Sequence, residues 1–83
     1  MPAELVDILG EEYDENGGCE PMLLFWYVQV GDSVAEGQDL CEVESAKAVV
    51  VITAPTSGVL SELFANEGDA VASGQVLGRI RCD

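Results

Sequence analysis

Lys47 is the sole lysine of this 83-residue chain and the side chain whose chemistry matters most here. The sequence contains no histidine, which excludes histidine-based catalysis and any Ser-His-Asp triad. Cys19, Cys41 and Cys82 form no C-x-x-C pair, and their spacing fits none of the usual zinc motifs. We therefore expect no catalytic group and no metal site. The Lys47 amine remains as a possible target for modification by another enzyme.

The charge of the chain excludes several classes of partner. The sequence has 16 acidic and 3 basic residues, so its formal net charge is −13. Phosphate backbones and anionic membrane surfaces would repel such a protein, and we expect it to bind neither nucleic acid nor membranes. The apolar runs are too short for a transmembrane helix, and residues 1–9 lack the features of a signal peptide. An odd number of cysteines favours a reducing, cytoplasmic compartment over a disulfide scaffold.

An internal repeat of 37 residues indicates the architecture. Gly31 to Leu40 is identical to Gly68 to Leu77 at seven of ten positions. Each copy begins with Gly-Asp, continues through a Gly-Gln turn and ends at a strand. A duplication of this kind predicts two similar halves related by an approximate two-fold axis.

Short apolar segments without helical periodicity surround both copies and favour an all-β fold. The chain is long enough for one domain over residues 1–83. We expect a flattened β-barrel or sandwich of two roughly four-stranded sheets with quasi-two-fold symmetry. The expected strands are Met22 to Val30, Leu40 to Glu44, Ala48 to Thr53, Val59 to Phe64 and Val76 to Arg81. The expected core comprises Leu23, Val34, Leu40, Val43, Val50, Ile52, Leu60, Val71, Leu77 and Ile80, with Cys41 on the inward face.

Lys47 lies between the two copies, in Glu44-Ser45-Ala46-Lys47-Ala48. Alternating residues on both sides predict a β-hairpin with Ala46 and Lys47 as its tight turn. A lone exposed lysine is usually a solvated charge. A hairpin tip held by two strands rich in β-branched residues is rigid and accessible, however, as a residue that another enzyme modifies must be. Val49 and Val51 would face outward, and we expect the N-terminal segment to cover them; the alternative is a small exposed apolar patch.

The region from Met22 to Ile80 resembles a lipoyl domain of the biotinyl/lipoyl carrier family. The resemblance lies in Gly31, sixteen residues before Lys47, in Glu44, three before it, and in Gly58, eleven after it. Ala48 follows the lysine, and Trp26-Tyr27-Val28 precedes the first Gly-Asp turn. The resemblance implies a lysine carried at a hairpin tip. Lys47 would be the attachment site, with Glu44, Ala46, Ala48, Gly31 and Gly58 presenting its hairpin.

The resemblance also implies a cofactor. Biotin carriers have methionine on both sides of the lysine, whereas this chain has Ala46 and Ala48. Lipoyl domains commonly place aspartate before the lysine, and an apolar residue there, after Glu-Ser, is closer to glycine-cleavage H-proteins. We expect covalently attached lipoate on Lys47, with a biotin carrier of a carboxylase or an unmodified β scaffold as alternatives.

The expected function is a non-catalytic carrier in a 2-oxo acid dehydrogenase-type or glycine-cleavage-type system, shuttling acyl or aminomethyl groups and reducing equivalents. The implied partners are a lipoate ligase or lipoyltransferase, dehydrogenase or decarboxylase components, and dihydrolipoamide dehydrogenase. The carrier itself is expected to be a monomer.

An acidic loop is expected at about residues 10–20, where Glu11-Glu12-Tyr13-Asp14-Glu15 is the densest charge cluster. Twelve of the acidic residues precede Lys47. The loop is either a solvated segment that keeps the protein soluble, or a recognition loop that steers the carrier to a basic rim on a partner. We favour the second interpretation.

Overall fold

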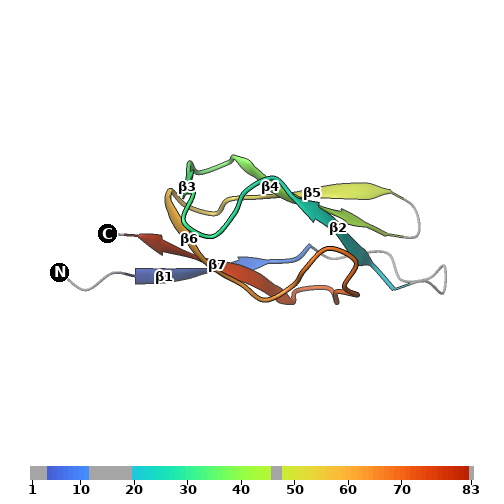
Figure 1. The fold of residues 1–83 in the computed structure, drawn as a ribbon. Coiled ribbons are helices and arrows are strands. Elements are labelled where there is room, and N and C mark those ends of the chain that lie inside the picture. The colour runs from blue at the N-terminus through green and yellow to red at the C-terminus, as the bar shows by residue number, and fades with distance from the viewer. Residues whose placement is uncertain (1–3, 12–19, 46–47, 83) are drawn as a thin grey trace.

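The computed structural model describes residues 4–11, 20–45 and 48–82, which form seven β-strands in two antiparallel sheets. The strands are β1 (Glu4–Leu9), β2 (Met22–Trp26), β3 (Ser33–Val34), β4 (Asp39–Glu44), β5 (Val49–Thr53), β6 (Gly58–Leu63) and β7 (Val76–Cys82). One sheet has the order β1-β7-β6-β3 and the other the order β2-β4-β5. Figure 1 shows the two sheets as layers of an elongated sandwich. Among the described residues there is no helix long and apolar enough to cross a membrane.

The all-β sandwich is confirmed, but its two sheets differ by one strand. The three-stranded sheet ends in a single bridge between Met22 of β2 and Ala70. Ala70 lies 37 residues after Ser33, which belongs to β3 of the other sheet. The bridge therefore occupies the position of a fourth strand that is too short to be counted as one.

Hydrogen bonds between the halves repeat with the 37-residue offset of the sequence. The Gly31 N–H donates to the Leu60 carbonyl at 2.8 Å, and the Gly68 N–H donates to the Leu23 carbonyl at the same distance. Gly31 and Gly68 have φ values of +99° and +89°, which residues with a Cβ rarely adopt. Each Gly-Asp turn is thus fixed by glycine and tied to a strand of the other half.

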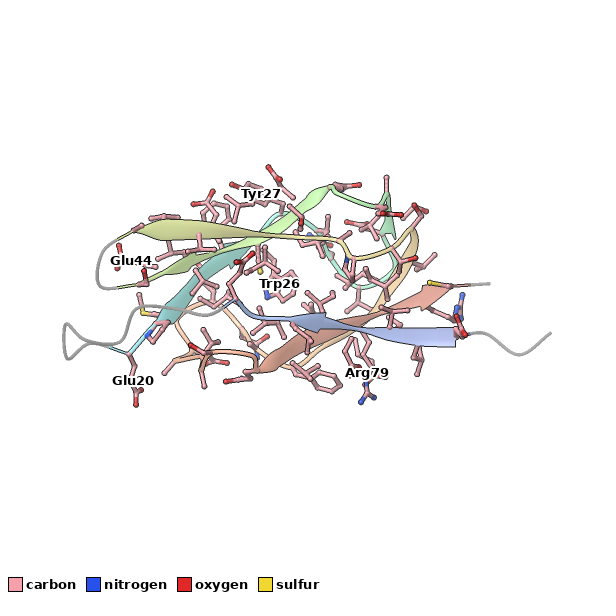
Figure 2. All side chains as sticks on the ribbon, turned by 180° about the vertical axis from the view of Figure 1, so that it is seen from behind. Glu20, Trp26, Tyr27, Glu44 and Arg79 are labelled. Atoms are coloured by element: carbon pink, nitrogen blue, oxygen red, sulfur yellow. The ribbon has the colours of Figure 1, made fainter. Side chains whose placement is uncertain are left out.

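The core lies between the two sheets and contains most of the predicted residues. Nine of the ten predicted residues are buried, and Val50 is partly buried against them. Ile8, Val28, Ala54 and Ala65 also belong to the core, and Cys41 is buried as predicted. The half-buried Trp26 lies between the layers in Figure 2, and its indole N–H donates to the Ala65 carbonyl at 2.9 Å. The indole therefore packs against the core without leaving its one donor unpaired.

Candidate functional site

The predicted hairpin around Lys47 is formed by β4 and β5. Glu44 and Val49 are the last paired residues of its two arms. Ala46 and Lys47 lie outside the described residues, so their role stays a prediction. The arms themselves are confirmed, and they bring both ends of the lysine-containing segment to one end of the sandwich (Figure 1).

Ser45 and Ala48 close the hairpin just beyond these arms. The Ser45 N–H donates to the Ala48 carbonyl at 2.8 Å, and the Ser45 hydroxyl donates to the same carbonyl at 2.8 Å. The Ala48 N–H donates in turn to Ser45 Oγ at 3.4 Å. Sequence reasoning gave Ser45 no role, although a hydroxyl residue before a two-residue turn is a recognised local signal.

The end of the hairpin is open to solvent. Glu44 and Ala48 are exposed, and Ser45 is partly exposed. Glu44, the last residue of β4, also pairs with Met22, the first residue of β2. In Figure 2, Glu44 and Glu20 lie at the same end of the molecule. This end of the molecule therefore presents carboxylates beside the open end of the hairpin.

Gly31 and Gly58 lie in the part of the fold where β3 pairs with β6, and the structure does not bring them together with the hairpin. An added Cβ at Gly58 would lie 2.3 Å from the Arg81 carbonyl oxygen and 2.7 Å from Ile80 Cγ2 of β7. Gly58 therefore permits close packing of β6 against β7, as Gly31 permits the turn before β3. Both glycines thus serve the fold, and presentation of the hairpin by these glycines stays a prediction.

The described residues include a buried thiol and a small hollow, but no cluster of metal ligands. No group of three or more acidic or cysteine side chains among them could hold a metal ion. Cys41 is buried, and burial raises the pKa of its thiol to about 12, which keeps it protonated. A hollow of about 230 Å³ beside the start of β2 is lined by Glu20, Ala70, Val71, Ala72 and Gln75. It is smaller than most small-molecule sites.

A protein-family model matches most of the chain. The Biotin_lipoyl family model, described as "Biotin-requiring enzyme", matches residues 10–80. The chain belongs to the biotinyl/lipoyl carrier family. The resemblance inferred from the lysine spacing is thus confirmed at the level of the family.

Two curated relatives are parts of dehydrogenase complexes. The chain is 42% identical over 77 residues to the dihydrolipoyllysine-residue succinyltransferase component of the 2-oxoglutarate dehydrogenase complex of Staphylococcus saprophyticus, a match that covers 93% of the chain and 17% of the relative. It is 39% identical over 77 residues to the mitochondrial lipoamide acyltransferase component of the branched-chain alpha-keto acid dehydrogenase complex of Arabidopsis thaliana. This match covers 92% of the chain and 16% of the relative. The chain therefore spans about one sixth of the length of these relatives.

Two solved structures have the same fold. The lipoyl domain of the 2-oxoglutarate dehydrogenase complex of Azotobacter vinelandii has a TM-score of 0.67 and 26% identity, covering 88% of this chain and 94% of that one. The urea carboxylase of Kluyveromyces lactis has a TM-score of 0.78 and 22% identity, and the match covers 96% of this chain and 6% of the carboxylase chain. The likeness to the carboxylase concerns the fold alone.

Proposed function

We propose that this chain is a covalent lipoyl carrier whose swinging arm is attached to Lys47. The main support for this proposal is the β4–β5 hairpin. Its exposed end is closed by Ser45 and Ala48, which flank Ala46 and Lys47 in the sequence. A member of a carrier family with a single lysine, flanked in sequence by such a closure, has one candidate attachment point.

The protein's own residues position the attachment point and leave it accessible. Attachment as an amide would remove the Lys47 charge, and the bound dithiolane would supply reversible acyl-group and electron transfer. Glu44 and Ala48 lie at the open end of the hairpin, so nothing described there would restrict a long arm. The domain contributes effective concentration, because a tethered reactant reaches successive active sites without diffusing away.

Lipoate is favoured over biotin by the residues beside the lysine and by the relatives. Ala46 and Ala48 stand where biotin carriers have methionine. The names of both curated relatives refer to lipoyl chemistry, and the Azotobacter vinelandii structure is a lipoyl domain of nearly the same length. These relatives also favour a 2-oxo acid dehydrogenase complex over a glycine-cleavage system.

The partners follow from this role. A lipoate ligase or lipoyltransferase would modify Lys47, and the carrier would then visit a 2-oxo acid dehydrogenase or decarboxylase component, an acyltransferase centre and dihydrolipoamide dehydrogenase. The domain itself would be a non-catalytic part of that system, since the chain corresponds to about one sixth of the acyltransferase components it resembles. The free thiols of Cys41 and Cys82 support a reducing, cytoplasmic compartment.

Intact mass measurement followed by fragment sequencing tests the proposal. The chain should be produced in cells that supply lipoate, biotin and both attachment enzymes, beside a Lys47→Arg variant. We expect a lipoyl increment localised to Lys47 and no increment in Lys47→Arg, with both proteins folded.

The modified protein should then be reductively acylated by a 2-oxo acid dehydrogenase component in the presence of its substrate, and the Lys47→Arg variant should not. A biotinyl increment would instead identify the protein as a biotin carrier of a carboxylase. An unmodified Lys47 in the native source would leave only the scaffold alternative.

A further inference from the structure

An aromatic–acidic cluster lies on the outer face of the β2-β4-β5 sheet. It consists of Phe25, Tyr27 and Glu42. The two rings meet edge to face with centroids 4.9 Å apart and an interplanar angle of 77°. The Tyr27 hydroxyl donates a hydrogen bond to Glu42 Oε2, and Tyr27 lies at the outer surface of its layer in Figure 2. Phe25 and Tyr27 are 37% and 49% exposed, so an organised aromatic pair faces solvent.

Two valines extend the cluster across the sheet. Val51 of β5 pairs with Glu42 of β4, which also pairs with Phe25 of β2. Val49 and Val51 are 50% and 39% exposed. The expectation that the N-terminal segment covers these valines is wrong for its described part, because β1 pairs with β7 in the opposite sheet. The cluster is thus continuous with an exposed apolar strip on the strands that carry the hairpin.

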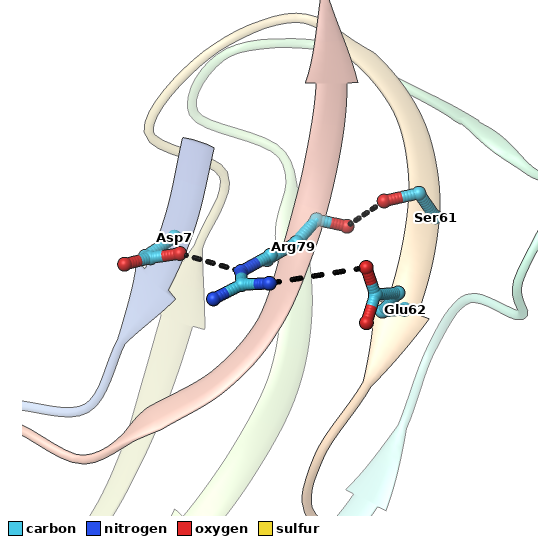
Figure 3. Close-up of polar contacts among 4 residues, drawn as sticks. All are labelled: Asp7, Ser61, Glu62 and Arg79. Carbon is cyan, nitrogen blue, oxygen red and sulfur yellow. Dashed lines mark hydrogen bonds and ion pairs between the residues drawn. The ribbon is translucent and has the colours of Figure 1, made fainter. Parts of the chain in front are cut away.

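The other half of the molecule has a corresponding cluster that holds a guanidinium group. Arg79 Cζ lies 5.1 Å from the centre of the Phe64 ring. Its Nε is 2.9 Å from Asp7 Oδ1 and its Nη1 is 3.9 Å from Glu62 Oε1, as Figure 3 shows. An aromatic ring and two carboxylates from neighbouring strands therefore surround one arginine.

The two clusters occupy equivalent positions of the repeat. Tyr27 and Phe64 are 37 residues apart, and so are Glu42 and Arg79. The backbone agrees, because the Tyr27 N–H donates to the Leu40 carbonyl at 2.8 Å and the Phe64 N–H donates to the Leu77 carbonyl at 2.9 Å. The half that contains Arg79 therefore supplies its own cation. The half that contains Glu42 presents a carboxylate at the equivalent position.

No cation of the described strands completes the cluster of Phe25, Tyr27 and Glu42. Within the described strands β2, β4 and β5 there is no lysine or arginine, and both arginines of the chain lie on β7 of the other sheet. Rings combined with a carboxylate attract a guanidinium group, which stacks on aromatic faces and binds carboxylate oxygens. Tyr27 uses one oxygen of Glu42 and leaves the other oxygen of that carboxylate for a further donor.

We propose that Phe25, Tyr27 and Glu42 bind an arginine side chain of a partner protein. The arginine stem would lie along Val51, and its guanidinium group would contact the rings and Glu42. A second copy of this chain is a poor occupant, because two molecules of charge −13 repel each other. The inference rests on the proposed function only in identifying the partner as an enzyme that the carrier visits. Docking at this face would hold the hairpin end against that enzyme.

A titration with a capped arginine peptide tests the inference. The unmodified 83-residue chain is observed by ¹⁵N and methyl NMR while Ac-Val-Arg-Val-Arg-Gly-amide is added. The matched ligand has citrulline in place of both arginines and so keeps the shape without the charge. We expect shift changes centred on Phe25, Tyr27 and Glu42 with the arginine peptide, and at least about five-fold weaker binding of the citrulline peptide.

Variants separate the cluster from general charge attraction. Tyr27→Leu and Glu42→Gln should each weaken binding of the arginine peptide about five-fold, while Glu36→Gln, which removes the same charge from an exposed turn, should change it less than about two-fold. The same spectra report whether each variant is folded. Equal binding of both peptides, or equal effects of Glu42→Gln and Glu36→Gln, would overturn the inference.

Because the titration uses the unmodified chain, its result is independent of whether Lys47 carries lipoate. A failed titration would leave the proposed function intact, and an unmodified Lys47 would leave the arginine site intact.

Discussion

Cys41 shows how a single residue is placed by an irregularity of its strand. The pairing of β4 with β5 shifts register between Asp39 and Cys41. Neighbouring residues of a regular strand face opposite sides, yet Leu40 and Cys41 are both fully buried. The bulge therefore brings the thiol into the core, and desolvation there raises its pKa from 9.0 to about 12.

The raised pKa predicts a loss of stability in alkali. Below about pH 9 the thiol is protonated in both the folded and the unfolded chain, so its contribution is fully present. Between about pH 9 and pH 12 only the unfolded chain ionises, and the free energy of unfolding falls by up to about 1.4 kcal/mol per pH unit. Urea unfolding of the wild type and Cys41→Ala over this range measures the difference. We expect the wild-type curve to fall more steeply; parallel curves would contradict the buried thiol.

Under the proposed function, modification of Lys47 would depend on the β4–β5 hairpin. Its arms are fixed by cross-strand pairs, but its closure depends on the Ser45 hydroxyl as well as on the backbone. Serine is polar and short, so it can satisfy the Ala48 backbone groups without adding bulk beside the lysine segment. The closure of the hairpin is thus made by local hydrogen bonds between Ser45 and Ala48.

Ser45→Ala tests this closure. We expect it to lower the free energy of unfolding by about 1 kcal/mol and to reduce kcat/KM for modification of Lys47 by lipoate ligase several-fold, because the tip loses its side-chain bonds. Ser61→Ala is the matched control, since the Ser61 hydroxyl also donates to a backbone carbonyl, that of Arg79, at 3.2 Å in the other sheet. The control should lose similar stability with unchanged modification kinetics. Equal kinetics for both variants would show that the closure has no part in recognition.

Charge is unevenly distributed over the whole molecule. Both arginines lie on β7, in a sheet whose strands also carry Glu4, Asp7 and Glu62. The described strands of the hairpin sheet carry Asp39, Glu42 and Glu44 and no basic residue. The molecule is elongated, with extents of 46 × 19 × 18 Å, and Glu44 and Arg79 lie on opposite layers in Figure 2. A negative field at the hairpin end would therefore guide this end towards a positively charged partner site.

Steering of this kind predicts a strong salt dependence. The rate constant kcat/KM for reductive acylation of the lipoylated domain should fall several-fold between about 0.02 and 0.3 M salt, because screening shortens the range of the attraction. Free lipoamide, which carries no domain, is the control substrate and should respond little. A domain rate that is flat across this range would exclude steering.

The residue pattern was sufficient for the two halves, for five of the seven described strands and for most of the core, but it did not predict β1 or β3. The repeat predicted the turns at Gly31 and Gly68 because local backbone conformation depends mainly on nearby residues. Alternation in β4 and β5 predicted the hairpin arms and the core residues that those arms contribute, because one side of each strand must be apolar. The unique lysine and its spacing identified the attachment residue as a prediction.

Tertiary structure decided the features that depend on distant pairing. The bulge that buries Leu40 together with Cys41 and the pairing of β1 with β7 both arise from contacts between remote segments. The exposed cluster of Phe25, Tyr27 and Glu42 likewise exists only where β2 meets β4. Local preference fixes which side of a strand is apolar, but the register between strands depends on packing of the whole sandwich. For that reason the residue pattern predicted the arms of the hairpin, whereas the exposed cluster of Phe25, Tyr27 and Glu42 beside them depends on the fold.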